Sequence, residues 1–236
     1  MNIVHDGGLM RESAESLFTI LYLAAVMIMG VCLVKGNQGK KQYLLYGSMA
    51  ITLGLGDLFL LISNTLNYLS VQTGRLIPMT EIGRQITAIA ITLFYLMLYY
   101  FWRVRYQING RQPVTEAVWG LSIFRIILCF FHIASYMMPG NPLTDIRVHN
   151  LWEEYQIIPL LGLGILLIRL FYQSARNTHD FEFQSSWMII TVIFICYACI
   201  EICKGITIAE IVSMVLLTGA YLYLVGLGCL AMRKGK

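Results

Sequence analysis

Long apolar runs, each followed by a short polar segment, repeat along the chain. The runs have the length of about 17 to 25 mainly apolar residues that a helix needs to cross a bilayer. Unbroken apolar segments such as Leu160–Ile168 lack the two-residue alternation of a membrane β-barrel strand. The pattern therefore predicts an all-α bundle of seven transmembrane helices, over Leu17–Val34, Tyr43–Leu66, Ile82–Trp102, Ala117–Met138, Leu151–Phe171, Phe183–Ile202 and Gly205–Met232.

The composition agrees with lipid as the solvent. Of the 236 residues, 58% are hydrophobic and only 13% are charged, and the mean hydropathy is +0.68. A water-soluble globule is excluded, because a chain of this size must still present a largely polar surface to water. The connecting segments are too short for an extramembrane domain, so we expect residues 1–236 to form one transmembrane domain.

Lys and Arg residues near the span ends predict the orientation, because cytoplasmic loops are enriched in them. Eleven lie on one side: Lys35, Lys40, Lys41, Arg103, Arg105, Arg111, Arg169, Arg176, Arg233, Lys234 and Lys236. Five lie on the other: Arg11, Arg75, Arg84, Arg147 and Lys204. The N-terminus is therefore expected outside and the C-terminus in the cytoplasm. The net charge of +4 reflects this topology, and no nucleic-acid partner is expected, because no basic stripe lies outside the membrane-flanking segments.

Polar residues within the spans are few, and such residues usually mark a pathway, a pocket or an internal ion pair. Span four carries a continuous polar stripe at helical spacing, formed by Ser122, Arg125, Cys129 and His132. Counting the helical rise from the cytoplasmic ends places most of the polar groups in the outer half of the membrane and Arg125 deeper. We therefore expect an outward-facing polar pocket that binds or transports a small or lipid-like ligand. Its expected residues are Asp57, Asn64, Arg84, Arg125, His132, Glu154, Glu201 and Glu210.

Two other uses of these residues stay open at this level. Asp57, Arg125 and His132 would hold spans two and four in register if they paired with one another, which makes a structural subunit without a ligand an alternative. A membrane hydrolase would use Asp57 as a general base and His132 as a further catalytic group.

The sequence predicts neither a metal nor a cofactor. His132 is the only histidine within a span, whereas a zinc hydrolase needs three converging ligands. Cys196, Cys199 and Cys203 share one face of span six, but no histidine lies beside them, so we interpret them as small apolar fillers. The expected partners are membrane lipids and a small-molecule ligand.

Glycines recur in pairs two residues apart within the spans, as Gly54 with Gly56, Gly162 with Gly164, and Gly226 with Gly228. A glycine removes side-chain bulk and so allows a neighbouring helix to approach closely. We expect these glycines to lie at helix contacts.

Five segments carry family motifs: Gly56–Phe59 (Gly-Asp-Leu-Phe), Gly83–Thr87, Phe94–Tyr106, Phe124–Cys129 and Leu170–Ala175. Over most of its length the chain resembles a group of seven-span membrane proteins of Gram-positive bacteria that has no assigned activity. The resemblance implies a bacterial cell membrane. In that group a His follows the Gly-Asp motif and a Pro-Arg pair comes soon after, whereas this chain has Leu60, Ser63 and Asn64 there.

The Gly56-Asp57-Leu58 segment also resembles the helix motif of lysoplasmalogenase-like (YhhN-type) membrane hydrolases, which act on vinyl-ether lysolipids. This resemblance implies hydrolysis with Asp57 as the base. Those enzymes are expected to use a second intramembrane aspartate, for which Glu201 and Glu210 would be the substitutes here.

Overall fold

The computed structural model describes residues 3–37, 39–72, 79–110, 113–137, 146–178, 184–202 and 207–234. These residues form seven α-helices and no strand. The helices are α1 (Ile3–Lys35), α2 (Lys41–Gln72), α3 (Met79–Arg105), α4 (Pro113–Met137), α5 (Ile146–Thr178), α6 (Gln184–Ile202) and α7 (Thr207–Lys234). The all-α prediction is thereby confirmed for the described part of the chain.

Several helices extend beyond the apolar runs that predicted them. The helix α1 begins at Ile3 rather than Leu17, and α5 runs from Ile146 to Thr178 around the predicted span Leu151–Phe171. The physical reason is that the apolar run marks only the part of a helix suited to lipid. The backbone hydrogen bonds of a helix form equally well in the headgroup region, so the helix continues there.

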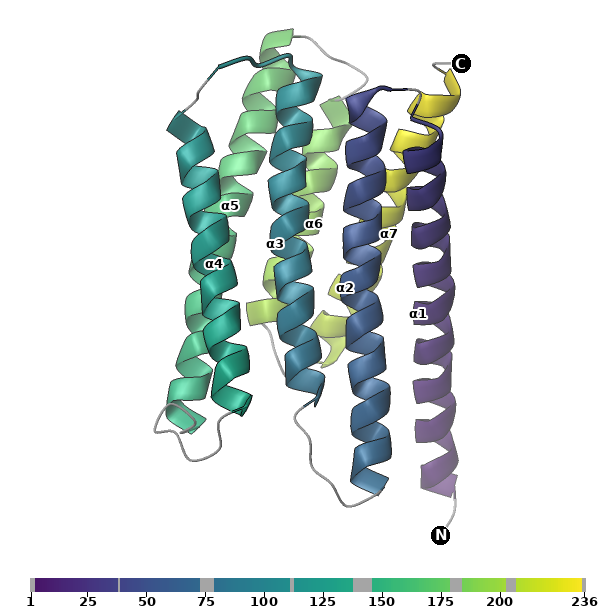
Figure 1. The fold of residues 1–236 in the computed structure, drawn as a ribbon. Coiled ribbons are helices and arrows are strands. Elements are labelled where there is room, and N and C mark those ends of the chain that lie inside the picture. The colour runs from purple at the N-terminus through teal and green to yellow at the C-terminus, as the bar shows by residue number, and fades with distance from the viewer. Residues whose placement is uncertain are drawn as a thin grey trace.

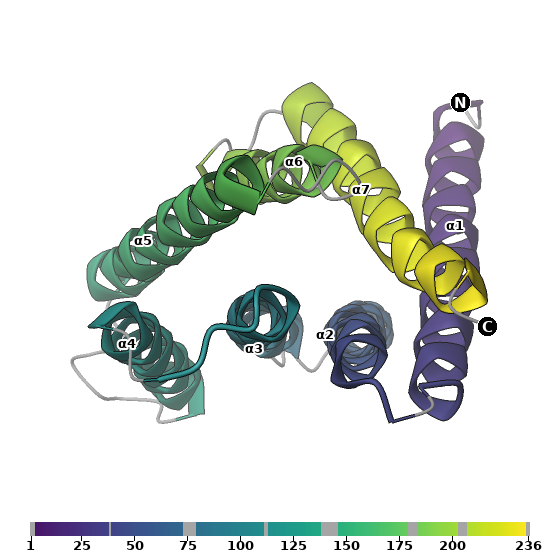
Figure 2. The ribbon, with the colours of Figure 1, turned by 90° about the horizontal axis from the view of Figure 1, so that it is seen from above.

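The seven helices form a closed arrangement in which each contacts the next along the chain and α7 contacts α1. Figure 2 shows α2, α3 and α4 in one row, with α5, α6 and α7 along an arc that faces them. Two further contacts, α3 with α5 and α2 with α7, cross between the two sides. Successive helices run in opposite directions, so the N-terminus and the C-terminus lie at opposite ends of the bundle (Figure 1).

The helix α3 has the central position. It contacts α2, α4 and α5, and it is the most deeply buried of the long apolar helices. Its buried side chains include Phe94, Tyr95 and Trp102. The indole Nε1 of Trp102 donates a hydrogen bond to Ser174 Oγ on α5 at 2.9 Å. The central helix thus supplies both the aromatic core and a polar tie to the opposite side.

The surface of the bundle is apolar where a soluble protein would be polar. Large hydrophobic side chains such as Phe124, Phe130 and Phe131 are exposed on α4, while Arg125 and His132 on the same helix are buried. This inverted distribution requires lipid around the bundle.

Within the described residues, five helices are long and apolar enough to cross a membrane, over Lys41–Leu66, Met79–Arg105, Pro113–Ser135, Tyr155–Asn177 and Val212–Arg233. The apolar segments described in α1 and α6 are shorter, Thr19–Lys35 and Met188–Ile200. The chain is therefore a multi-pass helical membrane protein.

Most of the glycines expected at helix contacts do lie there. A Cβ atom at Gly56 would fall 2.7 Å from Ala90 Cβ on α3, and one at Gly164 would overlap the ring of Phe194 on α6. A Cβ atom at Gly228 would meet the ring of Tyr46 on α2. Gly226 is the exception, because no atom lies within 4 Å of the position that its Cβ would take.

Candidate functional site

The polar stripe predicted on α4 faces the interior of the bundle. Ser122, Arg125, Cys129 and His132 are each at most 2% exposed, and the neighbouring Ile123, Phe124 and Ile127 face outward. Ser122 Oγ has its hydrogen-bond partner within the same helix, because it donates to the Val118 carbonyl at 2.7 Å. Burial of a whole polar face in a membrane protein is costly unless its groups find partners inside.

Arg125 reaches from α4 to two other helices. Its Nη1 donates a hydrogen bond to Thr92 Oγ1 on α3 at 3.1 Å, and its Cζ lies 5.8 Å from the centroid of the Tyr197 ring on α6. These contacts are a hydrogen bond and a cation–π contact, and neither neutralises the charge.

No carboxylate in the described part of the chain forms an ion pair with Arg125, and its Nε has no hydrogen-bond partner there. Glu201, one helical turn beyond Tyr197, has a side chain outside the described residues. The described surroundings of Arg125 therefore leave both its charge and one of its donors unsatisfied.

Two buried tyrosines lie in the interior, and one of them, Tyr95, is near this arginine. Tyr95 on α3 is within electrostatic range of Arg125 and of Tyr221 on α7. The Phe94 ring lies beside both, with centroid distances of 5.6 Å to Tyr95 and 5.5 Å to Tyr221. The hydroxyl groups of both tyrosines are buried without a hydrogen-bond partner among the described groups. Together with Arg125 Nε, they are three buried donors that lack a hydrogen-bond partner among the described groups.

Asp57 approaches the same region from α2. It is half-buried and lies within electrostatic range of Tyr22 on α1 and Tyr221 on α7. The helix α2 has no contact with α4 in the described residues, because α3 lies between them. Asp57 is therefore near tyrosines of α1 and α7, and the structure does not bring it directly against His132.

The other expected site residues lie elsewhere. Asn64 is exposed. Arg84 is also exposed, with 52% of its side chain accessible, and its Nη1 forms an ion pair with Glu81 Oε1 at 3.0 Å one turn away. The side chains of Glu154, Glu201 and Glu210 lie outside the described residues. Of the eight expected residues, Asp57, Arg125 and His132 are the ones that the structure places in or at the interior.

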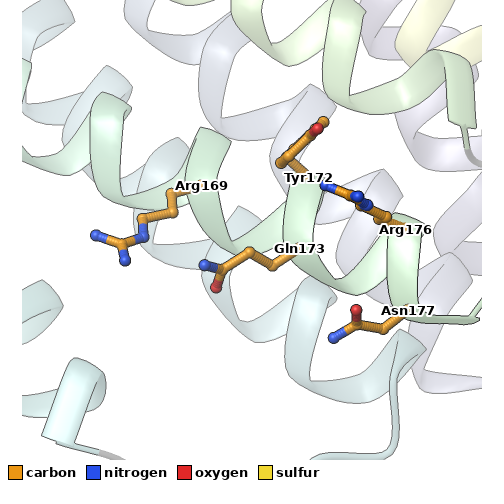
Figure 3. A pocket seen from close by; sticks show the side chains of 5 residues that line it. All are labelled: Arg169, Tyr172, Gln173, Arg176 and Asn177. Atoms are coloured by element: carbon orange, nitrogen blue, oxygen red, sulfur yellow. The ribbon is translucent and has the colours of Figure 1, made fainter.

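A hollow at the opposite end from the expected pocket is defined by α5. It has a volume of 780 Å³ and is lined by Arg169, Tyr172, Gln173, Arg176 and Asn177. Figure 3 shows these side chains along one side of the last turns of α5. They lie at the end of the bundle that holds the C-terminus and the connections from α1 to α2 and from α3 to α4 (Figure 1). Sequence reasoning used Arg169 and Arg176 only as orientation signals, because a position at a span end does not reveal a concave surface.

Sequence reasoning also passed over Thr92 and Tyr95. A threonine and a tyrosine are ordinary residues in a transmembrane helix, and nothing in the local pattern of α3 distinguishes them. Their importance comes from Arg125, which lies 33 residues later in the chain than Thr92. The one sequence signal available was the periodicity of α3, which places both residues on the apolar face of that helix but does not single them out on it.

The interior groups are hydrogen-bond donors, and this decides which chemistry they support. A guanidinium and two phenolic hydroxyls together favour a ligand group with several acceptor oxygens and a negative charge. No group of three or more His, Cys, Asp or Glu side chains with metal-binding proximity occurs in the ranges that the structure describes.

Comparisons with family models, with curated proteins and with solved structures find no match to this chain. The resemblances to the seven-span Gram-positive group and to the lysoplasmalogenase-like hydrolases therefore stay predictions.

Proposed function

We propose that this protein is a seven-span cell-membrane bundle that binds or transports a small or lipid-like ligand in its interior. In this proposal the N-terminus is outside and the C-terminus is in the cytoplasm. The ligand presents an anionic, oxygen-rich group to Arg125, with the hydroxyls of Tyr95 and Tyr221 as further donors.

The burial of Arg125 carries this proposal. The side chain is 2% exposed, and the described residues offer it one hydroxyl acceptor and one aromatic ring. A charge buried in this way costs several kcal/mol unless a counter-charge accompanies it. An anionic ligand would supply that counter-charge and would accept hydrogen bonds from the donors that lack partners.

Asp57 would border the ligand on the other side. Its carboxylate lies near Tyr221 and Tyr22, away from the helix that carries Arg125. The hydrolase reading uses the same carboxylate as a base, but no feature of the described residues favours it over binding.

The test compares the small molecules and lipids that co-purify with the protein, measured by native mass spectrometry and lipidomics. Wild type is compared with Arg125→Ala, Asp57→Asn and the double variant Tyr95→Phe/Tyr221→Phe, which removes two hydroxyls and keeps both rings. Tyr223→Phe is the matched control, because Tyr223 lies on α7 but faces outward. We expect a retained anionic molecule in wild type, in the control and in Asp57→Asn, because the loss of a neighbouring carboxylate does not weaken the binding of an anion. We expect a loss of at least about tenfold, equivalent to about 1.4 kcal/mol, in Arg125→Ala and in the tyrosine double variant.

An identical set of bound molecules in all five proteins would contradict the proposal. The interior contacts of Arg125 would then serve only to hold α3, α4 and α6 together. Turnover of the retained molecule by wild type and not by Asp57→Asn would favour the hydrolase reading.

A further inference from the structure

One face of α5 changes from apolar to basic along its length. Ile158, Ile165, Arg169, Tyr172 and Arg176 follow one another at intervals of seven, four, three and four residues, which places them on the same side of a helix. All of them are exposed: Ile158 is 63% and Ile165 is 61% accessible. The two isoleucines therefore face lipid in the direction in which the arginines face the 780 Å³ hollow.

The dimensions of this face match one leaflet of a bilayer. Eleven residues separate Ile158 from Arg169, which is about 16 Å along a helix and about half of a hydrocarbon core of about 30 Å. The apolar part of the face thus has the depth of one acyl layer. A lipid whose acyl chain lies along the apolar part would therefore reach the basic part with its phosphate.

The basic part is a concave site with anion-binding chemistry. Arg169, Gln173 and Arg176 line the hollow with Tyr172 and Asn177, and no acidic residue among those that the structure describes lines it. Neither arginine forms an ion pair with a carboxylate among the described residues. Guanidinium groups bind phosphate oxygens through paired hydrogen bonds, and Gln173 adds an amide donor.

The opposite face of α5 holds this site in place. Phe171 and Ala175 are buried, and Ser174 accepts the hydrogen bond from Trp102 Nε1 on the central helix. The backbone that carries the two arginines is therefore anchored to α3, while their side chains stay accessible.

We propose that this face of α5 binds one anionic phospholipid. The acyl chain lies along Ile158 and Ile165, and the phosphate lies in the hollow between Arg169 and Arg176. A net negative headgroup is preferred to a zwitterionic one, because the described lining of the hollow has two guanidinium groups and no carboxylate to receive an ammonium group. The proposal does not depend on the interior site at Arg125, since none of its residues belongs to that site.

The test measures lipid binding to the delipidated full-length protein in detergent by native mass spectrometry. The probes are phosphatidylglycerol and phosphatidylcholine with identical acyl chains. The variants are Arg169→Gln/Arg176→Gln and, as a control, Arg233→Gln/Lys234→Gln, which removes two charges from the same end of the bundle at α7. Inorganic phosphate at millimolar concentration serves as a competitor, because a free phosphate shares the headgroup chemistry.

We expect wild type and the α7 variant to prefer phosphatidylglycerol about tenfold, equivalent to about 1.4 kcal/mol, and the α5 variant to lose this preference. Displacement of phosphatidylglycerol by inorganic phosphate would show an anion site without a lipid role and would overturn the proposal. Equal losses in the α5 and α7 variants, or no preference in wild type, would also overturn it. Size-exclusion profiles of both variants check that the surface substitutions leave the fold intact.

Discussion

Thr92 shows how a single ordinary residue becomes important through its burial. Its hydroxyl donates to the Ala88 carbonyl at 2.8 Å in its own helix and accepts from Arg125 Nη1. The first bond is local and common in transmembrane helices. The second bond is the only hydrogen bond that the described residues provide for the Arg125 guanidinium, so the loss of this hydroxyl would leave a buried charge without an acceptor.

Replacement of Thr92 by valine removes this acceptor and keeps the side-chain shape. We expect the free energy of unfolding to fall by about 1–2 kcal/mol, because a buried charged donor is left unsatisfied. The measurement is equilibrium unfolding in mixed detergent–SDS micelles. Thr218→Val is the matched control, since Thr218 is also buried and donates to a carbonyl four residues earlier, but accepts no bond from a charged group among the described residues. Equal losses in the two variants would contradict the importance of the bond to Arg125.

At the scale of elements, the contact between α1 and α2 depends on the close approach of their backbones at Gly47. A Cβ atom at Gly47 on α2 would fall 2.7 Å from the Gly30 carbonyl oxygen and 3.0 Å from the Val34 nitrogen on α1. Backbone atoms cannot move aside as a side chain does. A larger residue at Gly47 would therefore have to push two backbones apart. Gly226, one of the paired glycines that stand out in the sequence, has open space at its Cβ position instead.

The variant Gly47→Ala should consequently weaken the packing of α1 on α2. We expect a loss of about 1–3 kcal/mol in the free energy of unfolding, as for an overpacked interior site. The matched variant Gly226→Ala should be neutral or stabilise the protein by up to about 1 kcal/mol, because alanine is the better helix former and meets no atom. Thermal unfolding in detergent, followed by circular dichroism, provides the comparison. A stabilising effect of Gly47→Ala would show that the two helices separate at no cost.

At the scale of the whole molecule, charge and topology agree. The basic residues in the last turns of α1, α3 and α5 are Lys35, Arg103, Arg105 and Arg176, and these helix ends lie at the same end of the bundle (Figure 1). The alternation of helix direction brings every second connection to that end. The enrichment of basic residues there predicts that this end faces the cytoplasm.

Reporter fusions test this orientation together with the number of spans. Alkaline phosphatase is active only outside the cell membrane, and green fluorescent protein exported through the general secretion pathway does not fluoresce. We expect phosphatase activity for fusions after Gln72 and Met137, and fluorescence for fusions after Ile108, Thr178 and Lys236. The opposite pattern at all five positions would show that the orientation is the reverse of the expected one. A mixed pattern would show that one of the helices does not cross the membrane.

The sequence by itself predicted much of this protein, because the relevant signals are local. Apolar run length predicted helices in every place where the described residues have one, and helical periodicity predicted that the α4 stripe lies on one face. The placement of the expected site residues was predicted only in part. Arg125 and His132 are buried as expected, whereas Asn64 and Arg84 face outward, because depth counting along a helix ignores the direction in which each side chain points.

The lateral order of the helices was decided only by the tertiary structure. The position of α3 between α2 and α4 separates Asp57 from His132 and gives Arg125 a hydroxyl of Thr92 as its partner. Hydropathy reports whether a residue prefers lipid, and a positive charge near a span end reports a side of the membrane. Neither quantity states which helix is next to which. That choice depends on side-chain packing between segments far apart in sequence, such as Gly164 against Phe194 and Trp102 against Ser174, and this packing exists only in the folded bundle.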